Sequence, residues 1–317
     1  MRLNRFVSIM LVLGVSGALA GCGGGDTPAS SGPASSGADS AKLAGASLTV
    51  GSKEFTESVL LGKITQAALE HAGAKVTDKT GISGSATVRA ALVAREIDMY
   101  WDYTGTGWVN ILGHTPTDLP PDLYKAVSEE DTTKNGIGWL KPAPFENSYA
   151  IAVSQKFADD NNVKTMSDAV GYLQSHPADS AVCAASEFIN RDDGLPGLEK
   201  AYGFKFGRVD ELEFNLIYTQ IGKKCPFGEA TTTDGRVLAN KLKILEDDKN
   251  FFLEYRGVLT ARKETLDKYP AITEVMAPIS EKLTNETLTE LNSKVDVDAE
   301  QPEDVAKEWL KSEGLLG

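Results

Sequence analysis

The sequence is poor in the residues from which most catalytic and metal sites are built. Only three histidines occur among its 317 residues, at His71, His114 and His176, and they lack the spacing of metal ligands. No HExxH, CxxC, GxSxG or P-loop pattern is present. We therefore expect no enzymatic activity, no cofactor and no metal ion.

Positive charge is also scarce, since 32 Lys and Arg face 45 Asp and Glu, for a net charge of −13. This balance argues against a nucleic acid partner, because a phosphate backbone requires a basic face. Beyond the N-terminus, no apolar run is long enough to cross a bilayer. The composition indicates an acidic folded protein that would not adhere to an anionic membrane surface.

The N-terminus has the marks of an export signal. Arg2 and Arg5 precede an apolar run at 6–15, which is long enough for a signal-peptide core but too short to span a membrane. Small residues then lead to Cys22, a pattern that resembles a bacterial lipoprotein signal. We predict a signal peptide at 1–21 and lipidation of Cys22, against the alternative of an ordinary secretory signal with a chance cysteine.

A tract rich in Gly, Ser, Ala and Pro follows Cys22. Such a composition cannot bury a core and behaves as a flexible tether. We predict that 22–46 tethers the protein outside the cytoplasm to the cell membrane. Lipidation of Cys22 would leave Cys183 and Cys225 as a pair for a disulfide in an oxidising compartment, although two separate buried thiols are the alternative.

About 270 residues remain for the folded body, enough for two lobes. Strand and helix patterns alternate along it, which predicts an α/β fold with parallel strands. Predicted strands lie at 47–52, 75–78, 97–101, 149–153, 181–184, 243–246 and from 258. Predicted helices lie at 56–71, 86–95, 166–173, 195–201, 233–242, 269–276, 279–283, 285–295 and 304–311.

Unusual residues gather at the ends of three predicted elements, where ligands of open α/β sheets bind. Lys53 stands at a helix N-terminus and favours an anion site, although a solvated lysine beside a routine cap is an equal alternative. The segment 97–107 holds three aromatic residues beside acids, and Trp101 and Tyr103 share one strand face. Arg191 lies among acidic residues, where a surface ion pair is the simpler interpretation.

Taken together and in this order, the segments GSKEFTES, IDMYWDYTGTG, EFINRDDGLPGL and TTDGR resemble the glycine betaine/carnitine/choline-binding proteins of osmoprotectant ABC importers. The resemblance covers the chain from about Leu48 onward. It implies a two-lobed, type II periplasmic-binding-protein fold with two hinge crossings. The lobes would be 47–148 plus 257–317, and 149–256, with Tyr149 and Tyr255 beside the hinge.

The resemblance also implies the site. An aromatic cage for a trimethylammonium group falls on Tyr103, Tyr149 and Tyr255, and Asn147 stands beside it. The residues that hold a carboxylate fall on Lys53, Thr106 and Arg191. One wall departs from the family, because Thr231 stands where a cage tyrosine is usual. Either that wall is missing, or Trp101 or Phe227 replaces it.

This constellation suits a quaternary ammonium, which has no N–H donor and is held by aromatic faces at about 0.5–2 kcal/mol each. Charge-assisted bonds to a carboxylate add about 1.5–3 kcal/mol each. Micromolar affinity needs about 8 kcal/mol, so both halves are required. We therefore predict a lipid-anchored, monomeric receptor that binds a zwitterionic amine such as glycine betaine and delivers it to ABC permease subunits.

Three alternatives remain at this point. The same fold would suit carnitine, choline or another betaine-like amine, with choline ranked lower because it has no carboxylate. An anchored surface hydrolase would use Asp98, Asp102 or Glu187 as acid and base, but these acids have no assigned partner. A lipoprotein that senses a ligand without transport is the third.

Overall fold

The computed structural model describes residues 42–316. The predicted signal peptide, Cys22 and most of the predicted tether lie outside these residues. The end of the tether, however, already belongs to the folded body. Leu43 and Ala46 are buried, and the Leu43 N–H donates to the Ala72 carbonyl over 2.7 Å. The fold therefore begins a few residues before the predicted start at 47.

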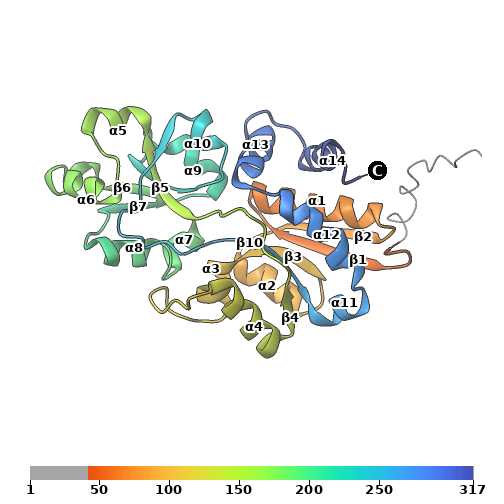
Figure 1. Cartoon of the computed structure of the whole chain (residues 1–317). Helices are drawn as coiled ribbons and strands as arrows, with labels where there is room; N and C mark the ends of the chain where they lie inside the picture. Colours follow the sequence, from red (N-terminus) through yellow and green to blue (C-terminus); the bar gives the residue numbers. More distant parts are fainter. Residues whose placement is uncertain (1–41, 317) are drawn as a thin grey trace, which may run out of the picture. The chain divides into compact units, whose positions relative to one another are not determined.

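The first of two five-stranded sheets has the order β2-β1-β3-β10-β4. Its strands are β1 (Ser47–Lys53), β2 (Lys75–Ile82), β3 (Met99–Tyr103), β4 (Ile137–Trp139) and β10 (Gly257–Arg262). The helical elements around it are α1 (Thr56–His71), α2 (Ser85–Val93), α3 (Thr104–Thr106), the π-helical turn η2 (Gly107–Ile111), α4 (Leu123–Asn135), α11 (Lys263–Lys268), α12 (Ala271–Lys282), α13 (Asn285–Asp296) and α14 (Pro302–Ser312). Figure 1 shows the blue C-terminal helices α12, α13 and α14 beside α1, which they contact.

The second sheet has the order β7-β6-β8-β5-β9. Its strands are β5 (Tyr149–Ser154), β6 (Ala181–Ala184), β7 (Arg208–Glu211), β8 (Phe227–Thr231) and β9 (Leu242–Ile244). Its helices are α5 (Gln155–Asn161), α6 (Met166–Ser175), the 3-10 turn η3 (Pro177–Asp179), α7 (Ser186–Asn190), α8 (Leu195–Tyr202), α9 (Phe214–Gln220) and α10 (Arg236–Ala239). In Figure 1 these green and cyan elements gather around the second sheet.

Both sheets are mixed, so the prediction of parallel strands was only partly right. β1 runs parallel to β2 and β3, but β10 is antiparallel to both β3 and β4. In the second sheet β6 runs parallel to β7 and β8, while β5 is antiparallel to β8 and β9. The reversed strands β5 and β10 are the first strands that the chain forms after each passage from one sheet to the other.

Each sheet has its own hydrophobic core, which follows from the sequence periodicity. On α1, Leu60, Ile64 and Ala68 recur at helical spacing and are buried against the first sheet. On the second sheet, the alternate residues Ile151 and Val153 of β5 enter the other core. None of the helices within 42–316 is long and apolar enough to cross a membrane.

Two predicted helices differ from those observed. The separate helices expected at 269–276 and 279–283 are one helix, α12, which continues through Pro278. Buried Met276 and Ile279 on either side hold it in place, which offsets the hydrogen bond that proline cannot donate. The helix expected at 233–242 is reduced to α10, because the segment bends back at once into β9.

Candidate ligand-binding site

One pocket draws its lining from both lobes, at the edge where the parallel strands of each sheet end. Strand β1 ends at Lys53 and β3 at Tyr103, while β6 is followed by Ala185. β5 starts at this edge because it runs antiparallel to β8, which pairs Tyr149 with Thr231. The lining residues are Lys53, Glu54, Phe55, Tyr103, Thr106, Asn147, Tyr149, Ala185, Glu187, Phe214, Glu229, Thr231 and Tyr255.

Five aromatic rings of this pocket form two groups. Tyr149 and Tyr255 meet edge to face, with ring centroids 5.3 Å apart. Phe55 lies 6.1 Å from both Tyr103 and Phe214, so that it joins the first lobe to the second. Such rings present electron-rich faces that attract a diffuse cation.

Lys53 is buried and already paired. Its Nζ lies 2.8 Å from Oδ1 of Asp102, which is fully buried and accepts a hydrogen bond from the Tyr100 hydroxyl over 2.5 Å. The ammonium also lies 5.1 Å from the centroid of the Tyr103 ring. Asp102 therefore holds the lysine charge at the wall of the pocket.

Arg191 lies behind the lining rather than in it. Its Nε and Nη2 donate to Asp193 over 2.8 and 2.6 Å, and its Nη1 donates to Glu187 over 2.6 Å. Its Nη2 also reaches the Thr106 hydroxyl of the first lobe at 3.4 Å, and the guanidinium lies 5.6 Å from the Tyr149 ring. The arginine is thus a buried ionic centre that touches two residues of the pocket, and not the exposed ion pair that was the simpler interpretation.

Two glutamates of the lining have opposite pKa shifts. Burial by itself raises the pKa of Glu187, but the charges of Lys53 and Arg191 and hydrogen bonds from Ser85 outweigh it and lower the pKa to about 2. Burial, together with the neighbouring Glu187, raises the pKa of Glu229 to about 8 against the Ala185 amide and Arg191. Near neutral pH, Glu187 is therefore ionised and Glu229 largely protonated.

Asn147 and Tyr103 are held by one buried carboxylate, Glu57. The Tyr103 hydroxyl and the Asn147 amide donate to Glu57 Oε1 over 2.7 and 2.8 Å. Thr233 of the second lobe donates to its Oε2, as does Asn292 of α13. This carboxylate fixes the orientation of two pocket residues from behind.

The structure thus brings seven of the nine expected site residues into one pocket: Lys53, Tyr103, Thr106, Asn147, Tyr149, Thr231 and Tyr255. Arg191 stands directly behind them. Trp101 does not reach the pocket, because its indole N–H donates to the Thr65 hydroxyl over 2.9 Å and its ring packs against Phe145 in the core.

The missing wall at Thr231 is therefore not supplied as expected. Phe227 is buried in the second core between Phe157 and Phe206. Phe55 and Phe214 line the pocket instead. Phe55 lies within the GSKEF segment, so its place in the pocket could have been predicted from the sequence. Nothing in the sequence indicates that Phe214 or Glu229 lines the pocket.

The acids considered for a hydrolase do not form a catalytic pair. Asp98 pairs with Arg262 and accepts the Thr49 N–H over 2.6 Å, and it does not line the pocket. Asp102 is committed to Lys53 and Tyr100. Glu187 is ionised and paired with Arg191.

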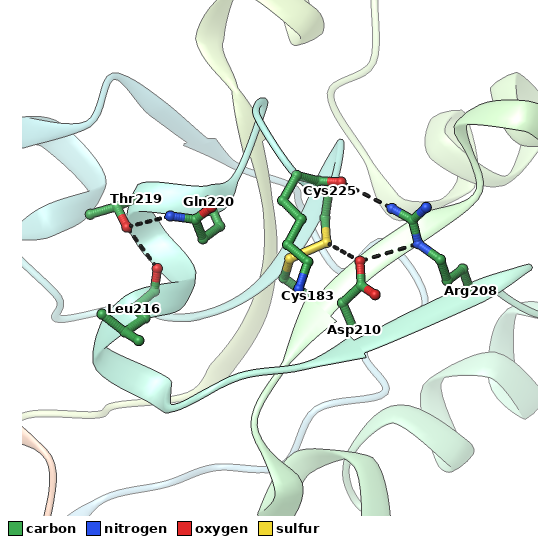
Figure 2. Close-up of a disulfide and its surroundings, with 8 residues drawn as sticks. Cys183, Arg208, Asp210, Leu216, Thr219, Gln220 and Cys225 are labelled. Carbon is green, nitrogen blue, oxygen red and sulfur yellow. Dashed lines mark hydrogen bonds and ion pairs between the residues drawn. A yellow bond between two sulfur atoms is a disulfide. The ribbon is translucent and has the colours of Figure 1, made fainter.

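A disulfide joins Cys183 of β6 to Cys225, which follows α9, with their Cα atoms 5.7 Å apart (Figure 2). Asp210 lies beside it and pairs with Arg208 at 3.1 Å. These three groups do not make a metal site, because both sulfur atoms are consumed in the bond. The disulfide ties β6, whose end reaches the pocket, to the segment that precedes β8.

Comparisons with known proteins agree with this geometry. The model of a family described as the substrate-binding domain of an ABC-type glycine betaine transport system matches residues 46–312. A glycine-betaine-binding protein of Pseudomonas aeruginosa is 34% identical over 278 residues, which are 85% of this chain and 88% of that protein. The ergothioneine transport permease/ergothioneine binding protein EgtU of Helicobacter pylori is 32% identical over 270 residues, 84% of this chain and 48% of that protein.

Among solved structures, one described as a glycine betaine/carnitine/choline ABC transporter aligns with a TM-score of 0.70 at 26% identity. The alignment covers 85% of this chain and 100% of that one. Every residue that lines the pocket falls within the segment matched by the family model.

Proposed function

This chain belongs to the family of substrate-binding domains of ABC-type glycine betaine transport systems, and we propose that its pocket captures a quaternary-ammonium zwitterion such as glycine betaine. It is a binding protein and not an enzyme, and its two sheets form the two-lobed periplasmic-binding-protein fold. As part of an importer it works with transporter components and outside the cytoplasm.

The observation that carries the proposal is the gathering of five aromatic rings from both lobes around one pocket. A trimethylammonium group offers no hydrogen bond donor, so aromatic faces are the means by which a protein selects it. Each face contributes about 0.5–2 kcal/mol, which makes the cage a major part of the affinity. Tyr103, Tyr149 and Tyr255 are the proposed cage, with Phe55 and Phe214 in place of the absent tyrosine at 231.

The ligand's carboxylate would be held by Lys53, Thr106 and Arg191. The Lys53 ammonium has three N–H donors, and Asp102 accepts one of them, which leaves donors for a ligand. Arg191 reaches Thr106 and lies against Tyr149, so the two ends of a small zwitterion would be recognised by adjoining groups. Choline has no carboxylate and would leave these carboxylate-binding residues without a partner in the ligand.

Binding would also close the lobes on each other. Ser85, at the start of α2 in the first lobe, donates to Glu187 of the second lobe through its N–H over 3.0 Å and its hydroxyl over 2.7 Å. Arg191 reaches Thr106 across the same boundary. A ligand that contacts both lobes stabilises the closed state by these differential contacts, and a membrane permease would recognise that state.

The proposal further includes the lipid anchor at Cys22, which would keep the receptor at the membrane surface beside its permease. The lobe boundaries that it assumes are 47–148 plus 257–317, and 149–256. All strands of each sheet fall within one of these two lobes.

Calorimetric titration of the purified protein with glycine betaine, carnitine, choline, ergothioneine and proline tests the proposal. We expect binding of one or more quaternary ammonium compounds at micromolar or better Kd, and no binding of proline, which lacks the methylated nitrogen. The proposal is overturned if none of the four quaternary compounds binds.

The carboxylate clamp has its own readout. Arg191→Ala is expected to weaken carboxylate-bearing ligands more than choline. The ratio of the two affinities isolates the clamp, because any general loss of stability lowers both. An unchanged ratio would remove Arg191 from the clamp.

A further inference from the structure

We infer that Glu229 makes this pocket selective for quaternary-ammonium compounds that carry an additional N–H or O–H donor, beyond their two charged ends. The inference rests on the proposed function and narrows its substrate class. It assigns a role to a residue that the aromatic cage and the carboxylate clamp do not use.

The position of Glu229 points to recognition of a donor. The residue lies on β8 opposite Ile151 of β5, is 2% exposed, and still lines the pocket. Within the described part of the chain, the single hydrogen bond to its carboxyl group is the Ala185 N–H, which donates to Oε2 over 2.7 Å. Oε1 is therefore left for a group that enters the pocket.

Glycine betaine cannot supply that group. Its nitrogen is fully methylated and its other end is a carboxylate, so it has no donor to offer. Beside glycine betaine, Glu229 would therefore either keep its own proton or stay ionised without a donor, which costs binding free energy. A hydroxyl or a ring N–H on the ligand would stabilise the ionised carboxylate, because a hydrogen bond to a charged acceptor is among the stronger ones in proteins.

A small side chain lines the pocket beside Glu229. Thr231 is two residues further along the same strand, on the same face, and also lines the pocket. A threonine at this position occupies less of the pocket beside the carboxyl group than a tyrosine would. We therefore regard the threonine at position 231 and the buried Glu229 as one adaptation. The pocket has one aromatic face fewer and gains an acceptor for a hydrogen bond from the ligand.

The charged groups around Glu229 determine which kind of ligand group can bind beside it. Glu187 and Arg191 are the charged groups that act on it, and Tyr149 is the neighbouring ring whose own pKa it raises. The ionised Glu187 disfavours a ligand carboxylate beside Glu229. A trimethylammonium group in the cage beside Tyr149 would favour the ionised, hydrogen-bond-accepting form of Glu229.

Matched ligand pairs test the inference by isothermal titration of the purified protein. Carnitine and γ-butyrobetaine differ by one hydroxyl, and N,N,N-trimethylhistidine and N,N,N-trimethylphenylalanine differ in the ring, which carries an N–H only in the histidine derivative. We expect the donor-bearing member of one or both pairs to bind about tenfold tighter or more. In Glu229→Gln, whose amide oxygen still accepts the Ala185 N–H, that preference should fall to within about threefold.

The possible outcomes separate this inference from the function on which it rests. Equal affinity within both pairs for the wild-type protein overturns the inference without any variant, and so does a preference that survives in a Glu229→Gln variant whose Tm is at least that of the wild type. Either result leaves the quaternary-ammonium receptor standing as long as the compounds bind. The proposed function itself fails only if no member of either pair binds and none of glycine betaine, choline and ergothioneine binds.

Discussion

The Thr233 hydroxyl donates a hydrogen bond to Glu57 Oε2 over 2.5 Å, and so links the segment after β8 in the second lobe to α1 in the first. Glu57 is buried, and burial raises its pKa against the hydrogen bonds from Thr233, Tyr103, Asn147 and Asn292. A carboxylate held by four donors from distant parts of the chain makes the junction of the lobes a single hydrogen-bonded network.

Thr233→Val is expected to lower the free energy of unfolding by about 1–3 kcal/mol, because it removes a donor from a buried carboxylate while keeping the side-chain shape. Chemical denaturation measures this. Thr273→Val, at an exposed position of α12, is the matched control and should change stability by less than about 0.5 kcal/mol. Equal effects of the two variants would mean that the network contributes nothing particular.

Phe214→Ala is expected to weaken quaternary-ammonium binding by up to about 30-fold, because it removes one aromatic face worth about 0.5–2 kcal/mol. Phe214 is half-buried on α9 and lines the pocket. Phe204→Ala provides the control, since Phe204 is equally half-buried but packs on the second core away from the pocket. Titration calorimetry should show the loss for Phe214 alone, and a similar loss for both variants would count against the cage.

Thr231→Tyr should strengthen glycine betaine binding by a factor of about 2 to 30, since it restores an aromatic face of the cage. Thr231→Ser, which adds no ring, should leave the affinity within about twofold. Weaker binding of glycine betaine to the tyrosine variant would show that a ring at position 231 obstructs the pocket and adds no face to the cage.

Replacing both Cys183 and Cys225 by Ala is expected to cost about 4 kcal/mol of stability, given a sequence separation of 42 residues. Thermal unfolding of the wild-type protein with and without a thiol reductant provides a second measurement of the same bond. Both treatments should lower Tm, and the reductant should have no effect on the double variant. A drop in the Tm of that variant on adding reductant would show that the reductant acts elsewhere.

The raised pKa of Glu229 predicts a pH dependence of stability. Between its ordinary value of 4.5 and the folded value of about 8, the folded protein holds a proton that the unfolded chain has lost. The stability from that proton is fully present below pH 4.5 and disappears as the pH rises toward 8. Glu229→Gln should therefore gain stability relative to the wild type between pH 5 and 8, by an amount on the order of a few kcal/mol. A constant difference between the two proteins across this range would contradict the shift.

Local patterns were sufficient for many individual elements. The spacing of Leu60, Ile64 and Ala68 predicted α1, which spans the predicted residues, and Tyr149 begins both the predicted and the observed strand. Such patterns could not predict the direction of a strand. The path of the chain between the two sheets makes β5 and β10 antiparallel to their neighbours. A strand's own residues carry no mark of the direction of its neighbours.

The site shows the same division. Lys53 and Tyr103 end strands of a sheet, so their place at a shared edge followed from the fold class. Trp101 sits two residues before Tyr103 on the same face, yet it packs in the core because Thr65 of α1 accepts its N–H. Whether a residue on a strand face reaches the pocket or the core depends on the helix that packs over it. For Trp101 that helix is α1, which comes from another part of the chain.

The order of motifs along the chain determined the family, the class of fold and most of the residues that meet in the pocket, because these depend on residue type at fixed positions. Which rings complete the pocket, and the placement of Glu229 with one hydrogen bond donor, were decided only when two separate sheets brought their edges together. The chemistry of a buried group depends on neighbours that are distant in sequence: Glu229 meets Ala185 at a separation of 44 residues, and Phe55 meets Phe214 from the other lobe.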